Sequence, residues 1–239
     1  SLPPFVSKQL IQRMVTSNPS PAYVNRVANV FVNNGSGVRG DMKAVIQAIL
    51  TDVEARDDSQ VDSASFGKLR EPVVRMVQWA RAFGVTSPTN AWPFGNNASS
   101  STRLAESPGR APSVFNWFRP GYTPPGTAIA SKGMVAPEFQ IANEPSVIAY
   151  INYIQTLIIN GAGEAKPNYD ELTPLATDSS ALLNELNLIL AAGQIGATTI
   201  GQMKIALDTI SVATSTGITN RIQAAIVLVM ASPEYLVQR

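Results

Sequence analysis

The chain has no cysteine and no histidine among its 239 residues. Without cysteine it can form no disulfide and offers no thiolate nucleophile or cysteine zinc ligand. Without histidine it lacks the usual general base near neutral pH and the Ser-His-Asp triad. Catalysis would have to use carboxylates, lysine, tyrosine or a Ser-Lys pair, and we expect no nucleophile motif. The composition therefore favours a protein that is not an enzyme, and we expect no cofactor and no metal.

Charge is also scarce. Charged residues make up 15% of the chain, and 18 basic and 17 acidic residues leave a net charge of +1. Nucleic-acid binding needs a concentrated basic surface, and no long run of one sign is present. No apolar run reaches the ~18 residues that would cross a bilayer. We therefore expect neither a nucleic-acid partner nor a membrane span.

Apolar residues recur at helical spacing along most of the chain. Turn and capping residues such as Ser20-Pro21 and Gly40-Asp41 mark where several of these segments begin. The predicted helices cover residues 4–16, 21–32, 42–50, 69–84, 135–161, 178–193, 198–213 and 218–231. Because few stretches alternate with period two, the sequence predicts a mainly α protein. We expect one domain over residues 1–239, built as an irregular helical bundle.

A long segment over residues 85–133 interrupts this pattern and is rich in Pro, Gly, Asn and Ser. Loops of this length without structure of their own are uncommon inside a domain. We therefore expect a surface-wrapping loop that holds one short helix near residues 112–118.

The same loop concentrates aromatic residues, which are only 7% of the whole chain. Flat aromatic rings beside amide and guanidinium groups suit sugar rings, through stacking and hydrogen bonding. The candidate ligand-binding residues are Trp92, Phe115, Asn116, Trp117, Arg119 and Tyr122. The alternative, which is the interpretation we favour for the loop, is that these aromatics anchor it to the helices, as long ordered loops require.

Two groups of carboxylates deserve a chemical interpretation. Residues 52–62 hold five acidic side chains, but the spacing lacks the Asp-x-Asp-x-Asp-Gly pattern of a calcium loop. We interpret them as solvated helix ends. Glu138, Glu144 and Glu234 lie beside prolines at predicted helix boundaries. A carboxylate pair could hydrolyse glycosides if held close together, but capping of helix starts is the interpretation we favour.

Seven segments, in order along the chain, together resemble the bacterial family of unknown function called DUF1800. They are residues 5–13, 16–24, 37–45, 68–73, 111–122, 137–141 and 231–238. The resemblance implies that this chain corresponds to the C-terminal half of such a protein. It also implies an extracytoplasmic location, periplasmic or secreted, and it brings no catalytic residues with it.

Three functions stay open at this point. The first is a non-enzymatic structural or binding protein in a cell-surface or matrix assembly, with polysaccharide contact. The second is a hydrolase whose catalytic groups lie largely in an N-terminal half. The third is a subunit of a self-assembling filament or lattice, favoured by low net charge. The expected partners are accordingly the N-terminal half, another copy of the chain, or polysaccharide.

Overall fold

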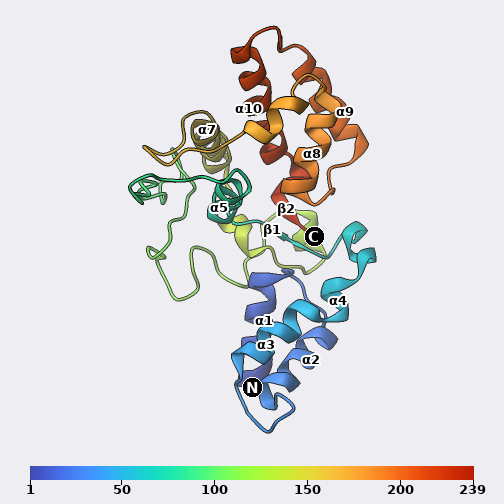
Figure 1. Ribbon diagram of the computed structural model, residues 1–239. Coiled ribbons are helices and arrows are strands. Elements are labelled where there is room, and N and C mark those ends of the chain that lie inside the picture. Colours follow the sequence, from blue (N-terminus) through green and yellow to red (C-terminus); the bar gives the residue numbers. More distant parts are fainter. The chain divides into compact units, whose positions relative to one another are not determined.

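Helices dominate the computed structural model, which describes residues 1–239 (Figure 1). The prediction of a mainly α protein is confirmed, since the only sheet has two strands of two residues each. By its internal contacts the chain divides into two compact units. Unit 1 comprises Ser1–Leu69, Phe115–Gln140 and Val237–Arg239, and unit 2 comprises Arg70–Val114 and Ile141–Leu236. The prediction of one domain therefore depends on whether the two units unfold together in one transition or separately in two, which an unfolding experiment can answer.

Unit 1 is built around three helices near the N-terminus, α1 (Leu2–Met14), α2 (Pro21–Val32) and α3 (Met42–Thr51). Short elements follow them, and the strands β1 (Lys68–Leu69) and β2 (Val237–Gln238) pair in antiparallel fashion. The short elements are α4 (Val53–Arg56), η1 (Asp58–Asp62), α6 (Ala128–Ser131) and η2 (Pro137–Ile141). The pairing of β1 with β2 brings the last residues of the chain into unit 1.

Local capping explains where the helices of unit 1 begin. The Ser20 hydroxyl accepts a hydrogen bond from the Tyr23 amide at 3.1 Å, and Pro21 occupies the first turn of α2. The Asp41 carboxylate accepts from the Ala44 amide at 3.1 Å at the start of α3. The three helices enclose a small apolar core made of Ile11, Val15, Tyr23, Val27, Phe31, Val45 and Ile49.

Unit 2 is a larger helical assembly in which α10 packs against α7, α8 and α9. Its elements are α5 (Pro72–Ala82), α7 (Glu144–Asn160), η3 (Asp170–Leu175), α8 (Ser179–Ala191), α9 (Ala197–Asp208), α10 (Ser215–Ala231) and α11 (Pro233–Leu236). At the end of α7, Gly161 has φ 64°, and a Cβ there would lie 2.3 Å from the carbonyl oxygen of Ala165. Only glycine allows this close return of the backbone.

The prediction of a short helix near residues 112–118 is wrong. These residues form turns, and Asn116 adopts a left-handed φ of 71° that no α-helix tolerates. The helix of this loop is α6, further along the chain. Pro112 stands at the start of these turns and Pro120 follows them.

Candidate functional site

The six candidate ligand-binding residues fall in both units of the molecule. Trp92 belongs to unit 2, whereas Phe115, Asn116, Trp117, Arg119 and Tyr122 belong to unit 1. The structure brings the last five together on one continuous loop, residues 115–122, which we call the aromatic loop. Trp92 is described with its own unit below.

A buried ring anchors the aromatic loop to α1. Phe118 is only 2% exposed, and the guanidinium carbon of Arg13 lies 4.4 Å from the centre of its ring. Arg13 also donates a hydrogen bond from Nη2 to the carbonyl oxygen of Phe115 at 3.0 Å. Phe118 therefore performs the anchoring role, and a cation–π contact with Arg13 supports it.

Backbone hydrogen bonds fix the rest of the aromatic loop. The amide of Tyr122 donates to the carbonyl of Arg119 at 3.1 Å, which closes a turn, and Ala136 donates to the Tyr122 carbonyl at 2.8 Å. The Arg119 amide donates to the side-chain oxygen of Gln140 at 2.8 Å. The loop is therefore held in one conformation by contacts on both of its sides.

Several side chains of the fixed loop remain accessible. Phe115 is 46% exposed, Arg119 is exposed, and Trp117 and Tyr122 are half-buried. The result is a pre-formed surface in which aromatic rings and a guanidinium are presented by a rigid backbone. Such pre-organisation lowers the entropic cost of binding.

Trp92 lies on a separate exposed loop of unit 2. It is 50% exposed, and its indole Nε1 donates to Asn90 Oδ1 at 2.8 Å. Glu164 holds this loop in place, since its Oε1 accepts from the amides of Thr89 and Ala91 and from the hydroxyls of Ser87 and Thr89. The Ser87 and Thr89 hydroxyls, followed by these amides, lower the pKa of Glu164 to about 2.

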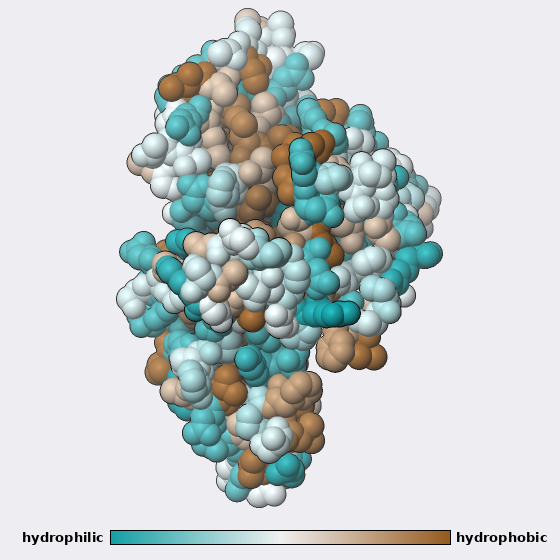
Figure 2. All heavy atoms as spheres, turned by 180° about the vertical axis from the view of Figure 1, so that it is seen from behind, coloured by the Kyte–Doolittle hydropathy of each residue, from teal (hydrophilic) through white to brown (hydrophobic).

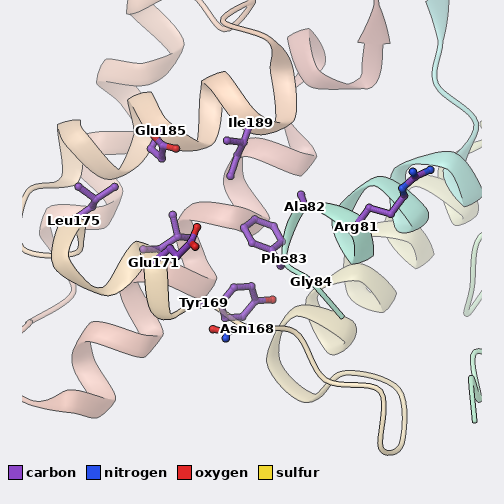
Figure 3. Close-up of a pocket in the computed structure, with 11 residues that line it drawn as sticks. Arg81, Ala82, Phe83, Gly84, Asn168, Tyr169, Glu171, Leu175, Glu185 and Ile189 are labelled. Carbon is purple, nitrogen blue, oxygen red and sulfur yellow. The ribbon is translucent and has the colours of Figure 1, made fainter. Parts of the chain in front are cut away.

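Unit 2 also contains a hollow that the sequence did not suggest (Figure 3). It has a volume of about 520 Å³, and its walls come from the end of α5, from η3 and from α8. Phe83 and Tyr169 form an edge-to-face aromatic pair in one wall, with ring centres 5.0 Å apart. We call this hollow the acidic pocket, because Glu171 and Glu185 are the acidic residues in its lining.

Tyr169 plays a structural role in the acidic pocket. Its hydroxyl donates to the carbonyl oxygen of Ile158 at 3.0 Å and accepts from the indole Nε1 of Trp79 at 3.1 Å. Burial raises the pKa of Tyr169 well above its ordinary value of 10.0. Tyr169 therefore stays protonated at neutral pH and braces the wall.

The sequence offered no signal for the acidic pocket. Glu171 lies near the start of η3 and Glu185 near the middle of α8, and neither belongs to a known motif. Only the packing of η3 beside α8 makes them neighbours in one lining.

The carboxylates of residues 52–62 act mainly as caps and ion-pair partners. Asp52 accepts from the amide of Glu54 at 2.9 Å and forms a two-pronged pair with Arg26, both contacts at 2.7 Å. The Arg26 hydrogen bond lowers the pKa of Asp52. Asp57 caps η1 by accepting from the Ser59 amide at 3.0 Å. The capping contacts of Asp52 and Asp57 agree with our interpretation of the segment as helix ends, but Asp52 is not solvated, since its side chain is 6% exposed.

The three glutamates beside prolines have different roles. Glu144 is exposed in the first turn of α7, and Glu234 accepts a hydrogen bond from the Thr199 hydroxyl. The capping interpretation is wrong for Glu138, which is 1% exposed and pairs with Lys68 at 3.1 Å. Burial of an ammonium and a carboxylate requires such pairing. The pair lies inside unit 1.

Lys68 also stands three residues after Ser65, a Ser-x-x-Lys spacing that contradicts our expectation of no nucleophile motif. Its ammonium, however, contacts Glu138 and donates to the carbonyl oxygen of Arg13 at 2.8 Å. The Ser65 hydroxyl instead lies 3.3 Å from that of Ser63 on the surface. The Lys68 ammonium thus forms an ion pair with Glu138 and does not act as a base for Ser65.

The fold and these sites define a mainly α protein with a rigid aromatic loop and a separate acidic pocket. The sequence profile of the family described as "Protein of unknown function (DUF1800)" matches residues 1–237, so the chain belongs to the DUF1800 family. No curated protein and no solved structure matches the chain. No helix is both long and apolar enough to cross a membrane.

Proposed function

We propose that the protein is a non-enzymatic, extracytoplasmic binding protein that contacts polysaccharide through the aromatic loop. The observation that carries this proposal is the fixed presentation of Phe115 and Arg119 beside Trp117 and Tyr122. The C–H faces of sugar rings stack on aromatic rings, and hydroxyl groups accept hydrogen bonds from guanidinium. The loop presents both kinds of group from one short segment.

The rigidity of the loop supports binding rather than flexible packing. The buried Phe118 ring and the Arg13 contacts hold the backbone, so the exposed side chains need little ordering when a ligand arrives. A repeating polysaccharide can occupy many such sites at once, and avidity then compensates for weak individual contacts.

Affinity electrophoresis in gels that contain dissolved polysaccharides tests this proposal. Retardation of the protein should depend on the aromatic loop, and the variants Phe115→Ala and Arg119→Ala should reduce it several-fold. A matched control is Phe5→Ala, which removes a 56% exposed phenylalanine elsewhere in unit 1. Equal retardation of all these proteins by every polysaccharide would reject the proposal. Release of reducing ends in the same mixtures would instead support the hydrolase hypothesis.

Self-association is a second candidate, and exposed apolar surface favours it. Brown, apolar side chains gather over the helices of unit 2 in the upper part of Figure 2. A groove between α7, α9 and α10 has a volume of about 430 Å³, and Ile159, Ile210 and Val227 are among its lining residues. Sedimentation velocity over a concentration series tests this candidate, and Val227→Asp should abolish any oligomer.

A further inference from the structure

We infer that the acidic pocket of unit 2 binds a small organic cation, namely a primary ammonium group carried on an apolar body. This site is separate in residues and chemistry from the aromatic loop of unit 1. The inference therefore stands or falls independently of polysaccharide binding.

The acidic pocket is large enough for a small ligand. Its volume of about 520 Å³ falls within the range of small-molecule pockets, about 300–1,000 Å³. In Figure 3, Glu171 approaches the hollow from η3 and Glu185 from α8, while Ile189 follows Glu185 by one turn of α8 and Phe83 lies to the right of Glu171. One ligand can therefore touch acidic and apolar walls at the same time.

The carboxylates of the pocket are available to a ligand. Glu171 is exposed and Glu185 is half-buried, and neither takes part in any ion pair of the protein. The cation in the lining, Arg81, extends away from both carboxylates in Figure 3. The walls thus present two negative charges that the protein itself does not neutralise.

The apolar walls decide which kind of cation fits. Leu175 and Ile189, which is 38% exposed, supply accessible hydrocarbon surface, and the buried Phe83 and Leu172 lie behind it. A calcium ion needs about six to eight oxygen ligands, and two carboxylates with apolar neighbours supply too few. An organic ammonium instead pairs with the carboxylates and buries its hydrocarbon body against these side chains.

Isothermal titration calorimetry with phenethylamine and 2-phenylethanol tests the inference. The two probes share one body and differ in the ammonium group, which is charged at neutral pH. We expect phenethylamine to bind at least about tenfold more tightly than the alcohol, the ratio that 1.4 kcal/mol provides. Raising the salt concentration should weaken the binding of phenethylamine and leave the binding of 2-phenylethanol unchanged.

Paired variants locate the site. Glu171→Gln with Glu185→Gln should lower the affinity for phenethylamine to that for the alcohol, and Ile189→Lys should block the amine by placing an ammonium in the pocket. Glu144→Gln removes an exposed carboxylate elsewhere in unit 2 and should change nothing. Because all these positions are at least partly exposed, thermal unfolding should verify that the variants fold.

Three results would overturn the inference. They are equal binding of the amine and the alcohol, no binding of the amine, and undiminished amine binding by the folded double variant. Polysaccharide retardation of the double variant should match that of the unchanged protein. Loss of amine binding with retained retardation therefore separates this site from the aromatic loop.

Discussion

The two units of the molecule differ in the proportion of apolar and polar side chains that they bury. Unit 2 buries a cluster of twenty-eight apolar residues, whereas the corresponding cluster of unit 1 has seven. Unit 1 buries six polar or charged side chains, Ser7, Gln12, Thr16, Ser17, Lys68 and Glu138, against its seven clustered apolar residues, whereas unit 2 buries eight against twenty-eight. In unit 1 the buried polar side chains are therefore nearly as numerous as the residues of its apolar cluster.

This difference has a physical consequence. Apolar packing depends on buried area and tolerates changes of shape, whereas a buried polar contact needs its partner at the right distance. Gln12 donates to the carbonyl of Ser17 at 2.9 Å, and Thr16 accepts from the amide of Gly67 at 3.0 Å. We expect unit 1 to respond most to loss of polar partners and unit 2 to loss of apolar volume.

The largest effect should come from Trp79→Ala in unit 2. Trp79 is fully buried and also donates its indole hydrogen bond to Tyr169. Truncation of such a side chain costs about 3–5 kcal/mol of the free energy of unfolding. Chemical denaturation measures the loss, and calorimetry reports whether it shifts one transition or only one of two. A single shifted transition would support the predicted single domain.

The matched control for this variant is Trp92→Ala, which removes the same side chain from a half-exposed position of the same unit. Its cost should stay within about 0.5 kcal/mol, as for most surface substitutions. Equal losses in the two variants would mean that burial does not govern the stability of unit 2.

The next effect should come from Glu138→Gln in unit 1. The substitution leaves the buried ammonium of Lys68 without its carboxylate partner. We expect a loss of about 3 kcal/mol, the lower end for a broken buried pair, because Lys68 keeps its hydrogen bond to Arg13. Urea denaturation provides the measurement.

A second variant separates charge pairing from packing. Glu138→Leu combined with Lys68→Met replaces both charges by apolar groups and should be more stable than Glu138→Gln alone. If the double variant is the less stable of the two, packing around the pair matters more than its charge balance.

Much of the fold could be predicted from helical periodicity, because the contacts that start a helix lie between residues close in sequence. Helix starts such as α2 and α3 were marked by Ser20-Pro21 and Asp41, whose caps act within three residues. The prediction of a helix at residues 112–118 fails because the apolar and aromatic content of the segment does not reveal the left-handed backbone of Asn116. Backbone geometry of that kind is set by contacts from elsewhere in the chain.

The candidate sites depended on longer-range contacts. The aromatic loop could be found from its composition, but its anchoring needed Arg13, about a hundred residues earlier. The pairing of Lys68 with Glu138 and the shared lining of Glu171 and Glu185 had no sequence signal at all. Each exists only because separate elements pack together.

Acid should weaken unit 2 partly through Glu164. Its pKa falls from 4.5 to about 2 in the folded protein, so its contribution is fully present above pH 4.5 and is lost as the pH falls toward 2. Glu164→Gln should therefore flatten the decline of unfolding free energy between those two pH values. Urea denaturation over a pH series measures this slope, and Glu144→Gln should leave it nearly unchanged. An unaltered slope in Glu164→Gln would show that the Ser87 and Thr89 contacts do not persist in solution.

The smallest effect should come from the surface ion pair of unit 1. Arg26 contacts Asp52 with two nitrogen–oxygen distances of 2.7 Å; the Arg26 side chain is 44% exposed and that of Asp52 is 6% exposed. Exposed pairs contribute about 0.2–1 kcal/mol, and Asp52 keeps its hydrogen bond from the Glu54 amide, so Arg26→Ala should cost about 1 kcal/mol, the upper end of this range. Screening by salt should reduce this cost further, whereas the loss in Glu138→Gln should be nearly independent of salt because its partner is buried. Urea denaturation at low and high salt compares the two variants, with Lys8→Ala as the control for loss of an exposed positive charge. If Arg26→Ala proved as costly as Glu138→Gln at high salt, burial would not be what distinguishes the polar contacts that hold unit 1 together.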